Sequence, residues 1–152
     1  MEPRIDYTKA NAGAARAMYA LEAYVKHSGL EMSLIDLVKL RASQINGCAY
    51  CIDMHTKDAR AAGESEQRLY LLDAWREAPF YTERERGALA WTEAVTLVAD
   101  NHVPDEVYEL ARQQFTEEEL VNLTMAVVAI NGWNRLSISF RSVPGSYQPA
   151  QR

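Results

Sequence analysis

The sequence predicts an all-α fold of six to seven helices within a single domain that spans residues 1–152. Apolar residues recur at spacings of three and four along most of the chain, which is the period of an amphipathic helix. Most of the seven glycines and five prolines stand where these stretches begin or end. Strand-like alternation is confined to a weak instance at residues 136–140, and no repeat or long linker divides the chain.

Glycines divide the first half of the chain into its expected helices. These are Thr8–His27, Leu34–Gln44, Cys48–Ala62 and Ser65–Arg76. Gly29, Gly47 and Gly63 follow the first three, and glycine ends helices readily because it adopts left-handed backbone angles at no steric cost. Ser33 precedes the second helix, where a serine side chain can act as the N-cap.

Capping boxes mark the longer helices of the second half. Thr82 with Glu85, and Thr116 with Glu119, have the spacing at which each side chain satisfies a free backbone donor of the other residue. A short helix is expected between them, opening at Pro104. The tail that follows the last helix is polar and rich in turn-forming residues.

Composition narrows the class of protein. With 48% hydrophobic and 24% charged residues, the chain can build a packed core and is not a disordered tail. A net charge of −5 argues against nucleic acid or an anionic membrane as the main partner. The first residues lack the apolar stretch of a secretory signal, and no run approaches the about 18 apolar residues of a membrane span. We therefore expect a cytoplasmic protein that does not insert into membranes.

The only two cysteines, Cys48 and Cys51, are three residues apart, which excludes the distributed bridges of a secreted disulfide scaffold. On a helix they share one face with His55. Because Asn46-Gly47 ends the preceding helix, the thiols should lie in a first turn, where free backbone donors favour the thiolate. His55 is placed to accept a thiol proton.

Three interpretations of this cluster remain open on spacing alone. The cysteines form a redox-active dithiol, or they are inert buried thiols, or Cys48, Cys51 and His55 are three ligands of a zinc ion. Asp36 is likewise open: it is a candidate to orient His55, and it also stands at the third position after Ser33, where a capping-box partner would be.

The remaining polar and aromatic residues around the cluster are expected to be structural. The charged residues in question are Lys39, Arg41, Lys57 and Arg60, which we expect on solvated helix faces. Trp91, Trp133 and Tyr50 are expected in the core or at an interface rather than around a substrate.

The run from Leu37 to Arg60, with its CxxCxxxH core, resembles the AhpD-like, carboxymuconolactone decarboxylase superfamily, in particular its short peroxidase-related branch. The central motif of the resemblance covers residues 33–64. Further matches lie at Arg86–Glu93 and Ile130–Arg135, so that the resemblance extends over most of the chain.

The resemblance implies an AhpD-like helical fold, assembled as a trimer or hexamer, with alkyl hydroperoxidase or thiol–disulfide oxidoreductase activity. It implies that Cys51 is oxidised to a sulfenic acid by a hydroperoxide, and that Cys48 is its proton donor and resolving partner. His55 would belong to the proton relay, and so would Asp36, where the family usually has glutamate. No bound cofactor is implied, because electrons would come from an external dihydrolipoyl- or thioredoxin-like donor.

Two residues depart from the best-studied peroxidase branch. Asp36 is one methylene shorter than glutamate, and Tyr50 stands where that branch has a histidine between the cysteines. The decarboxylase branch generally lacks the cysteine pair, so lactone decarboxylation is not expected. We predict a cytoplasmic antioxidant hydroperoxidase; the alternatives are a protein disulfide reductase or redox partner with little peroxidase activity, and a zinc-binding stress-sensing module.

Overall fold

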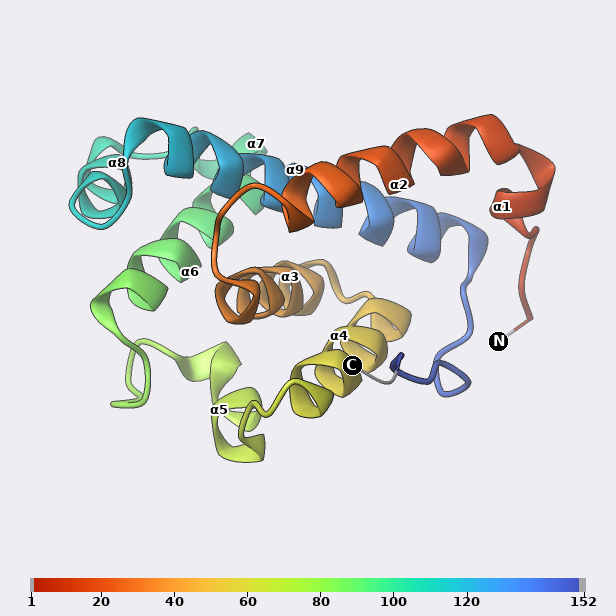
Figure 1. Ribbon diagram of the computed structural model, residues 1–152, viewed down its shortest axis with the longest axis horizontal. Coiled ribbons are helices and arrows are strands. Elements are labelled where there is room, and N and C mark those ends of the chain that lie inside the picture. The colour runs from red at the N-terminus through yellow and green to blue at the C-terminus, as the bar shows by residue number, and fades with distance from the viewer. Residues whose placement is uncertain (1, 151–152) are drawn as a thin grey trace.

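The computed structural model describes residues 2–150, and every regular element in this range is helical (Figure 1). The elements are α1 (Tyr7–Ala10), α2 (Ala12–Lys26), α3 (Met32–Asn46), α4 (Ala49–Ala61), α5 (Glu66–Tyr70), the 3-10 helix η1 (Leu72–Ala74), α6 (Glu83–Thr96), α7 (Val98–Asn101), α8 (Asp105–Arg112) and α9 (Glu117–Phe140). The predicted all-α class is therefore confirmed. Residues 136–140, which alternate weakly, are the last turns of α9.

Short breaks give more helices than the six or seven predicted: residues 2–150 contain nine α-helices and one 3-10 helix. The stretch predicted as one helix from Thr8 is interrupted at Asn11, whose side-chain oxygen accepts a hydrogen bond from the Ala14 N–H at 3.0 Å. An asparagine that caps a new helix in this way interrupts the preceding one, because its own backbone leaves the helical region.

Both predicted capping boxes are confirmed. The Glu85 N–H donates to Thr82 Oγ1 at 3.2 Å, and the Thr82 N–H donates to the Glu85 carboxylate at 2.8 Å. Thr116 and Glu119 repeat the arrangement at 3.2 and 2.8 Å. These local pairs set where α6 and α9 begin.

The predicted N-cap at Ser33 is wrong. Helix α3 begins at Met32, with Glu31 as its N-cap residue and no side-chain capping hydrogen bond. The Glu31 carboxylate is instead bound by Arg84, whose Nε donates to it at 2.8 Å. Ser33 therefore lies inside the first turn, and Asp36 is not the partner of a capping box.

Helix α3 is the centre of the molecule. It packs against α4, α6 and α9, and α2 runs beside α9 over it (Figure 1). One hydrophobic cluster, which includes Val38 and Val127, joins α3 to α2, α6 and α9. A second, which includes Leu37 and Leu72, joins α3 to α5, η1 and α6. Because α3 is covered on several sides, the charged residues Asp36 and Lys39 within it are buried too.

A tight connection places Cys48 at the start of α4. Gly47 ends α3 in the left-handed region at φ 68°, and the Cys48 N–H donates back to the Ser43 carbonyl at 3.0 Å. Side-chain amides hold this end of α3 against α9, because Asn46 Nδ2 donates to Asn131 and Asn134 at 3.0 and 2.8 Å. The position of the cysteine pair is thus set by contacts between helices as well as by the glycine turn.

The C-terminal tail returns to α4 (Figure 1). The Gly145 N–H donates to Asp53 Oδ2 at 2.9 Å, and the Tyr147 hydroxyl donates to Asp58 Oδ1 at 2.7 Å. Within the described residues, no helix combines the length and apolar character needed to cross a membrane.

Candidate active site

Cys48 and Cys51 form a disulfide, with their Cα atoms 5.3 Å apart. Cys48 is the N-cap residue of α4, and its Sγ accepts a hydrogen bond from the Cys51 N–H at 3.4 Å. The predicted position at a helix start is therefore confirmed, and in the reduced protein the same N–H would favour a thiolate. Both residues are almost completely buried, with exposed fractions of 1% and 2%.

The two cysteines line different cavities. Cys51 lines a cavity of about 350 Å³ between α2, α3, α4 and α9, together with His55 and Asp36. Cys48 lines a second hollow of about 220 Å³, where the start of α4 meets the end of α9. The structure thus gathers all four predicted site residues around the disulfide, with three of them on one cavity.

His55 is buried one turn after Cys51, with an exposed fraction of 7%. Burial, and secondly the positive charge of Lys39, lower its pKa to about 3. The imidazole is therefore neutral at physiological pH and can accept a proton at one nitrogen while it releases one from the other. Its Nε2 has no hydrogen-bond partner among residues 2–150.

An ion pair between Glu22 and Lys39 lies in the same cavity, and sequence reasoning missed it. Lys39 was predicted on a solvated face, but it is only 8% exposed. Glu22 binds Lys39 through Oε2, whereas its Oε1 is buried without a hydrogen-bond partner in the described part of the chain. One feature of the sequence does point to this site: Asp36 and Lys39 are charged residues within the otherwise apolar run of residues 34–40.

Tyr50 and Trp133, which were predicted in the core or at an interface, both line the cavity. The Trp133 ring contacts that of Tyr19, with centroids 5.2 Å apart. Burial raises the pKa of Tyr50, so its hydroxyl stays protonated at neutral pH. Trp91 belongs to the hydrophobic core as predicted. The cavity is thus lined by aromatic rings as well as by charged residues.

The other flanking cations are not all solvated either. Arg41 is mostly buried and donates to Glu93 at 2.9 Å. Lys57 binds the C-terminal tail, where it donates to the Gly145 and Tyr147 carbonyls at 3.2 and 3.1 Å. Only Arg60, paired with Glu66, has a largely exposed side chain. Within residues 2–150 there is no group of three His, Cys, Asp or Glu side chains placed to hold a metal ion.

The site thus combines a CxxC disulfide at a helix start, a buried histidine one turn later and an adjoining cavity, within an all-helical protein. The sequence profile of the carboxymuconolactone decarboxylase family matches residues 12–94. The chain belongs to this family, and the predicted AhpD-like fold is confirmed.

Relatives agree with the assignment. The uncharacterized protein YdfG of Bacillus subtilis is 44% identical over 139 residues, which cover 91% of this chain and 95% of that protein. A solved structure from Agrobacterium tumefaciens is 50% identical, with a TM-score of 0.93 over 96% of this chain and all of its own. That protein, of unknown function, is provisionally assigned as the antioxidant defence protein AhpD.

A more distant structure shares only the fold. The debrominase Bmp8 is 19% identical, with a TM-score of 0.83 over 91% of this chain and 75% of its own. Because a debrominase also has this fold, the fold alone does not define the activity of the present protein, which has to be argued from its own site.

Proposed function

We propose that this protein is a cytoplasmic antioxidant thiol peroxidase that reduces small hydroperoxides through Cys51 and is recycled through the Cys48–Cys51 disulfide. One observation carries the proposal: the sulfur pair that can close the disulfide lies at a helix start, and its second member shares a cavity with His55. Membership of a family with an AhpD-like antioxidant relative supports it.

The reaction proceeds in two balanced steps. The Cys51 sulfur attacks one oxygen of the hydroperoxide, the O–O bond breaks, and the thiol proton moves to the leaving oxygen, which gives a sulfenic acid and an alcohol. Cys48 then attacks the sulfenic acid, and a water molecule leaves as the disulfide forms. His55 relays the proton in the first step, and Asp36, the residue at the family's acidic position, is proposed to assist it.

The burial of both cysteines favours a small substrate. A protein disulfide would have to bring its own sulfur atoms into contact with side chains that are only 1% and 2% exposed. A cavity of about 350 Å³ instead has the size of a small-molecule site. This argues for hydroperoxide reduction over the alternative of a protein disulfide reductase.

Recycling requires an external dithiol, because the reaction consumes two electrons per turnover. Of the two donors expected, a dihydrolipoyl arm fits a buried disulfide better than a thioredoxin-like domain, since a slender arm can enter where a folded surface cannot. We further propose that the protein acts as a homo-oligomer. Val121 and Val128, exposed on α9 and seven residues apart, support this assembly because they lie on one helix face.

The test mixes the reduced protein with cumene hydroperoxide and follows free thiols and peroxide together. We expect two thiols to disappear for each peroxide consumed, with Cys51→Ser inactive and Cys48→Ser arrested as a sulfenic acid that dimedone traps. Persistence of both thiols, or a Cys51→Ser variant as fast as the parent, would overturn the proposal.

Two parallel measurements test the alternative functions, a protein disulfide reductase and a zinc-binding module. Efficient reduction of insulin without peroxide consumption would indicate a protein disulfide reductase. Stoichiometric zinc in protein purified without chelator would indicate that Cys48, Cys51 and His55 serve as metal ligands.

A further inference from the structure

Two buried polar atoms of the cavity stand out by their lack of partners. Among residues 2–150, the buried side-chain nitrogen and oxygen atoms without a hydrogen-bond partner are Glu22 Oε1 and His55 Nε2. Both residues line the cavity that contains Cys51. Buried polar groups are nearly always paired in folded proteins, with protein atoms or with ordered water. Two such atoms on one cavity therefore indicate that water or a substrate within it completes their hydrogen bonds.

His55 alone is a poor destination for the Cys51 proton. Its pKa is lowered to about 3 by burial and by Lys39, whereas an unperturbed thiol has a pKa of about 8.5. A stable imidazolium would also place a second cation beside Lys39. A neutral imidazole can still pass a proton on, provided that another group of the cavity accepts it.

We propose that Glu22, oriented by Lys39, is a catalytic acid–base residue of this cavity that stores the Cys51 proton and delivers it to the leaving oxygen of the hydroperoxide. The inference rests on the proposed peroxidase function and adds to it a residue outside the CxxCxxxH motif. Lys39 is a positioning residue, because it holds Oε2 of Glu22 and leaves Oε1 available.

The proton balance is complete within the site. His55 accepts the thiol proton at one nitrogen and passes the proton of its other nitrogen to the Glu22 carboxylate. As the Cys51 sulfur attacks and the O–O bond breaks, the protonated Glu22 donates to the departing oxygen. The products are the Cys51 sulfenic acid and an alcohol, and Glu22 returns to its anionic form beside Lys39.

Other charged groups face the same cavity from three of the helices around it. They are Lys26 on α2, Asp36 on α3 and Asp58 on α4. Tyr7, Tyr19 and Tyr50 add neutral hydroxyl groups. Glu22 differs from the other two carboxylates in that it combines a fixed ion pair with a buried oxygen atom lacking a partner.

The experiment compares two rates in the reduced Glu22→Gln variant. Alkylation of Cys51 by iodoacetamide reports the thiolate, whereas single-turnover consumption of cumene hydroperoxide also requires a proton for the leaving oxygen. We expect peroxide consumption to fall at least tenfold, because the leaving oxygen loses its proton donor. Alkylation should be as fast as in the wild type or faster, because in this slow reaction the thiol proton can pass to solvent and the removal of an anion favours the thiolate. Glu22→Asp should recover part of the peroxide rate.

The matched control is Glu85→Gln, which weakens a partly buried ion pair with Arg68 away from the cavity and should leave both rates unchanged. Equal slowing of both rates in Glu22→Gln, with no recovery in Glu22→Asp, would indicate a structural role and overturn the inference. A normal peroxide rate in Glu22→Gln would overturn it while the proposed function stands. If the wild type consumes no peroxide, the proposed function itself fails and the inference with it.

Discussion

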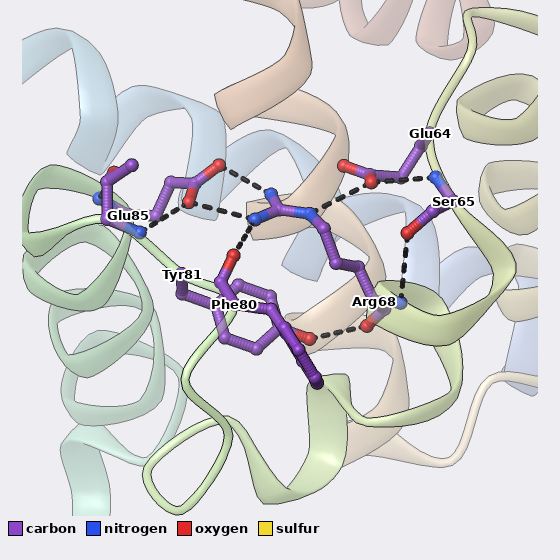
Figure 2. A network of polar contacts seen from close by, with 7 residues as sticks. Glu64, Ser65, Arg68, Phe80, Tyr81 and Glu85 are labelled. Atoms are coloured by element: carbon purple, nitrogen blue, oxygen red, sulfur yellow. Dashed lines mark hydrogen bonds and ion pairs between the residues drawn. The ribbon is translucent and has the colours of Figure 1, made fainter.

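Two clusters of partly buried charged residues differ in how completely they are paired. In the first, Arg68 donates from Nε to Glu64 at 2.9 Å and from Nη2 to Glu85 at 2.6 Å, and it also binds the Phe80 carbonyl (Figure 2). The Tyr81 hydroxyl binds the Arg68 carbonyl, while the guanidinium lies 4.8 Å from the centre of the Tyr81 ring. Burial alone would raise the pKa of Glu85, but the hydrogen bonds from Arg68 and Thr82, together with the charge of Arg68, outweigh it and lower that pKa.

The second cluster, formed by Glu22, Lys39 and His55, contains both unpaired buried atoms of the described residues. Its ion pair leaves one carboxylate oxygen unused, and its histidine is neutral because burial lowers the pKa to about 3. Charged residues of similar type are therefore paired more completely in the Arg68 cluster than in the cavity cluster. The Arg68 cluster connects α5 to the start of α6, whereas the cavity cluster leaves two buried polar atoms without a partner among residues 2–150.

The largest expected effect is on stability at the first cluster. Replacement of Arg68 by Met leaves the mostly buried carboxylates of Glu64 and Glu85 without their cation, which should cost about 3 kcal/mol of unfolding free energy. Urea denaturation measures the loss, with Arg68→Lys as a charge-retaining control. A loss below about 0.5 kcal/mol would show that the cluster behaves as an ordinary surface ion pair.

The second-largest expected effect is a pH dependence of the unfolding free energy, which arises from His55 in the cavity. Since the pKa of His55 is about 3 in the folded protein and about 6.5 when unfolded, only the unfolded chain binds this proton between those values. Stability from His55 is therefore complete above the unfolded pKa and falls as the pH is lowered, by about 2 kcal/mol between pH 7 and pH 5.

Comparison of denaturation at these two pH values for the wild type and His55→Asn measures the contribution. Glu85 and Glu93 have lowered pKa values, so their own losses fall near and below pH 4.5, outside this interval. An identical pH dependence in the two proteins would mean that His55 is protonated in the folded state.

The smallest expected effect is a change in the pKa of His55. Lys39→Met removes the nearby cation that is the second cause of the low pKa of His55, so this pKa should rise but stay below its ordinary value because burial remains. Titration of the His55 ring by NMR measures the change, and Lys39→Arg retains the charge as a control. An unchanged pKa in Lys39→Met would show that Lys39 does not act on the imidazole.

Local sequence patterns predicted the parts of this structure that depend on neighbours in the chain. Thr82 with Glu85 needs only three residues and a free helix end to form its capping box, and Gly47 needs only its own backbone freedom to end α3. Ser33 shows where such reasoning fails. Arg84, distant in sequence, binds Glu31, and the helix begins one residue before the predicted cap.

The sequence by itself determined the all-α class and the family. It also placed Cys48, Cys51 and His55 on one helix face, because helical spacing decides which of these residues lie together. Only the tertiary structure decided that Glu22 meets Lys39 beside them, that Tyr50 and Trp133 line a cavity, and that Lys39 and Arg41 are buried. These outcomes depend on how α2, α3, α4 and α9 pack together. Side chains from separate helices become neighbours only through that packing, which no spacing along one helix encodes.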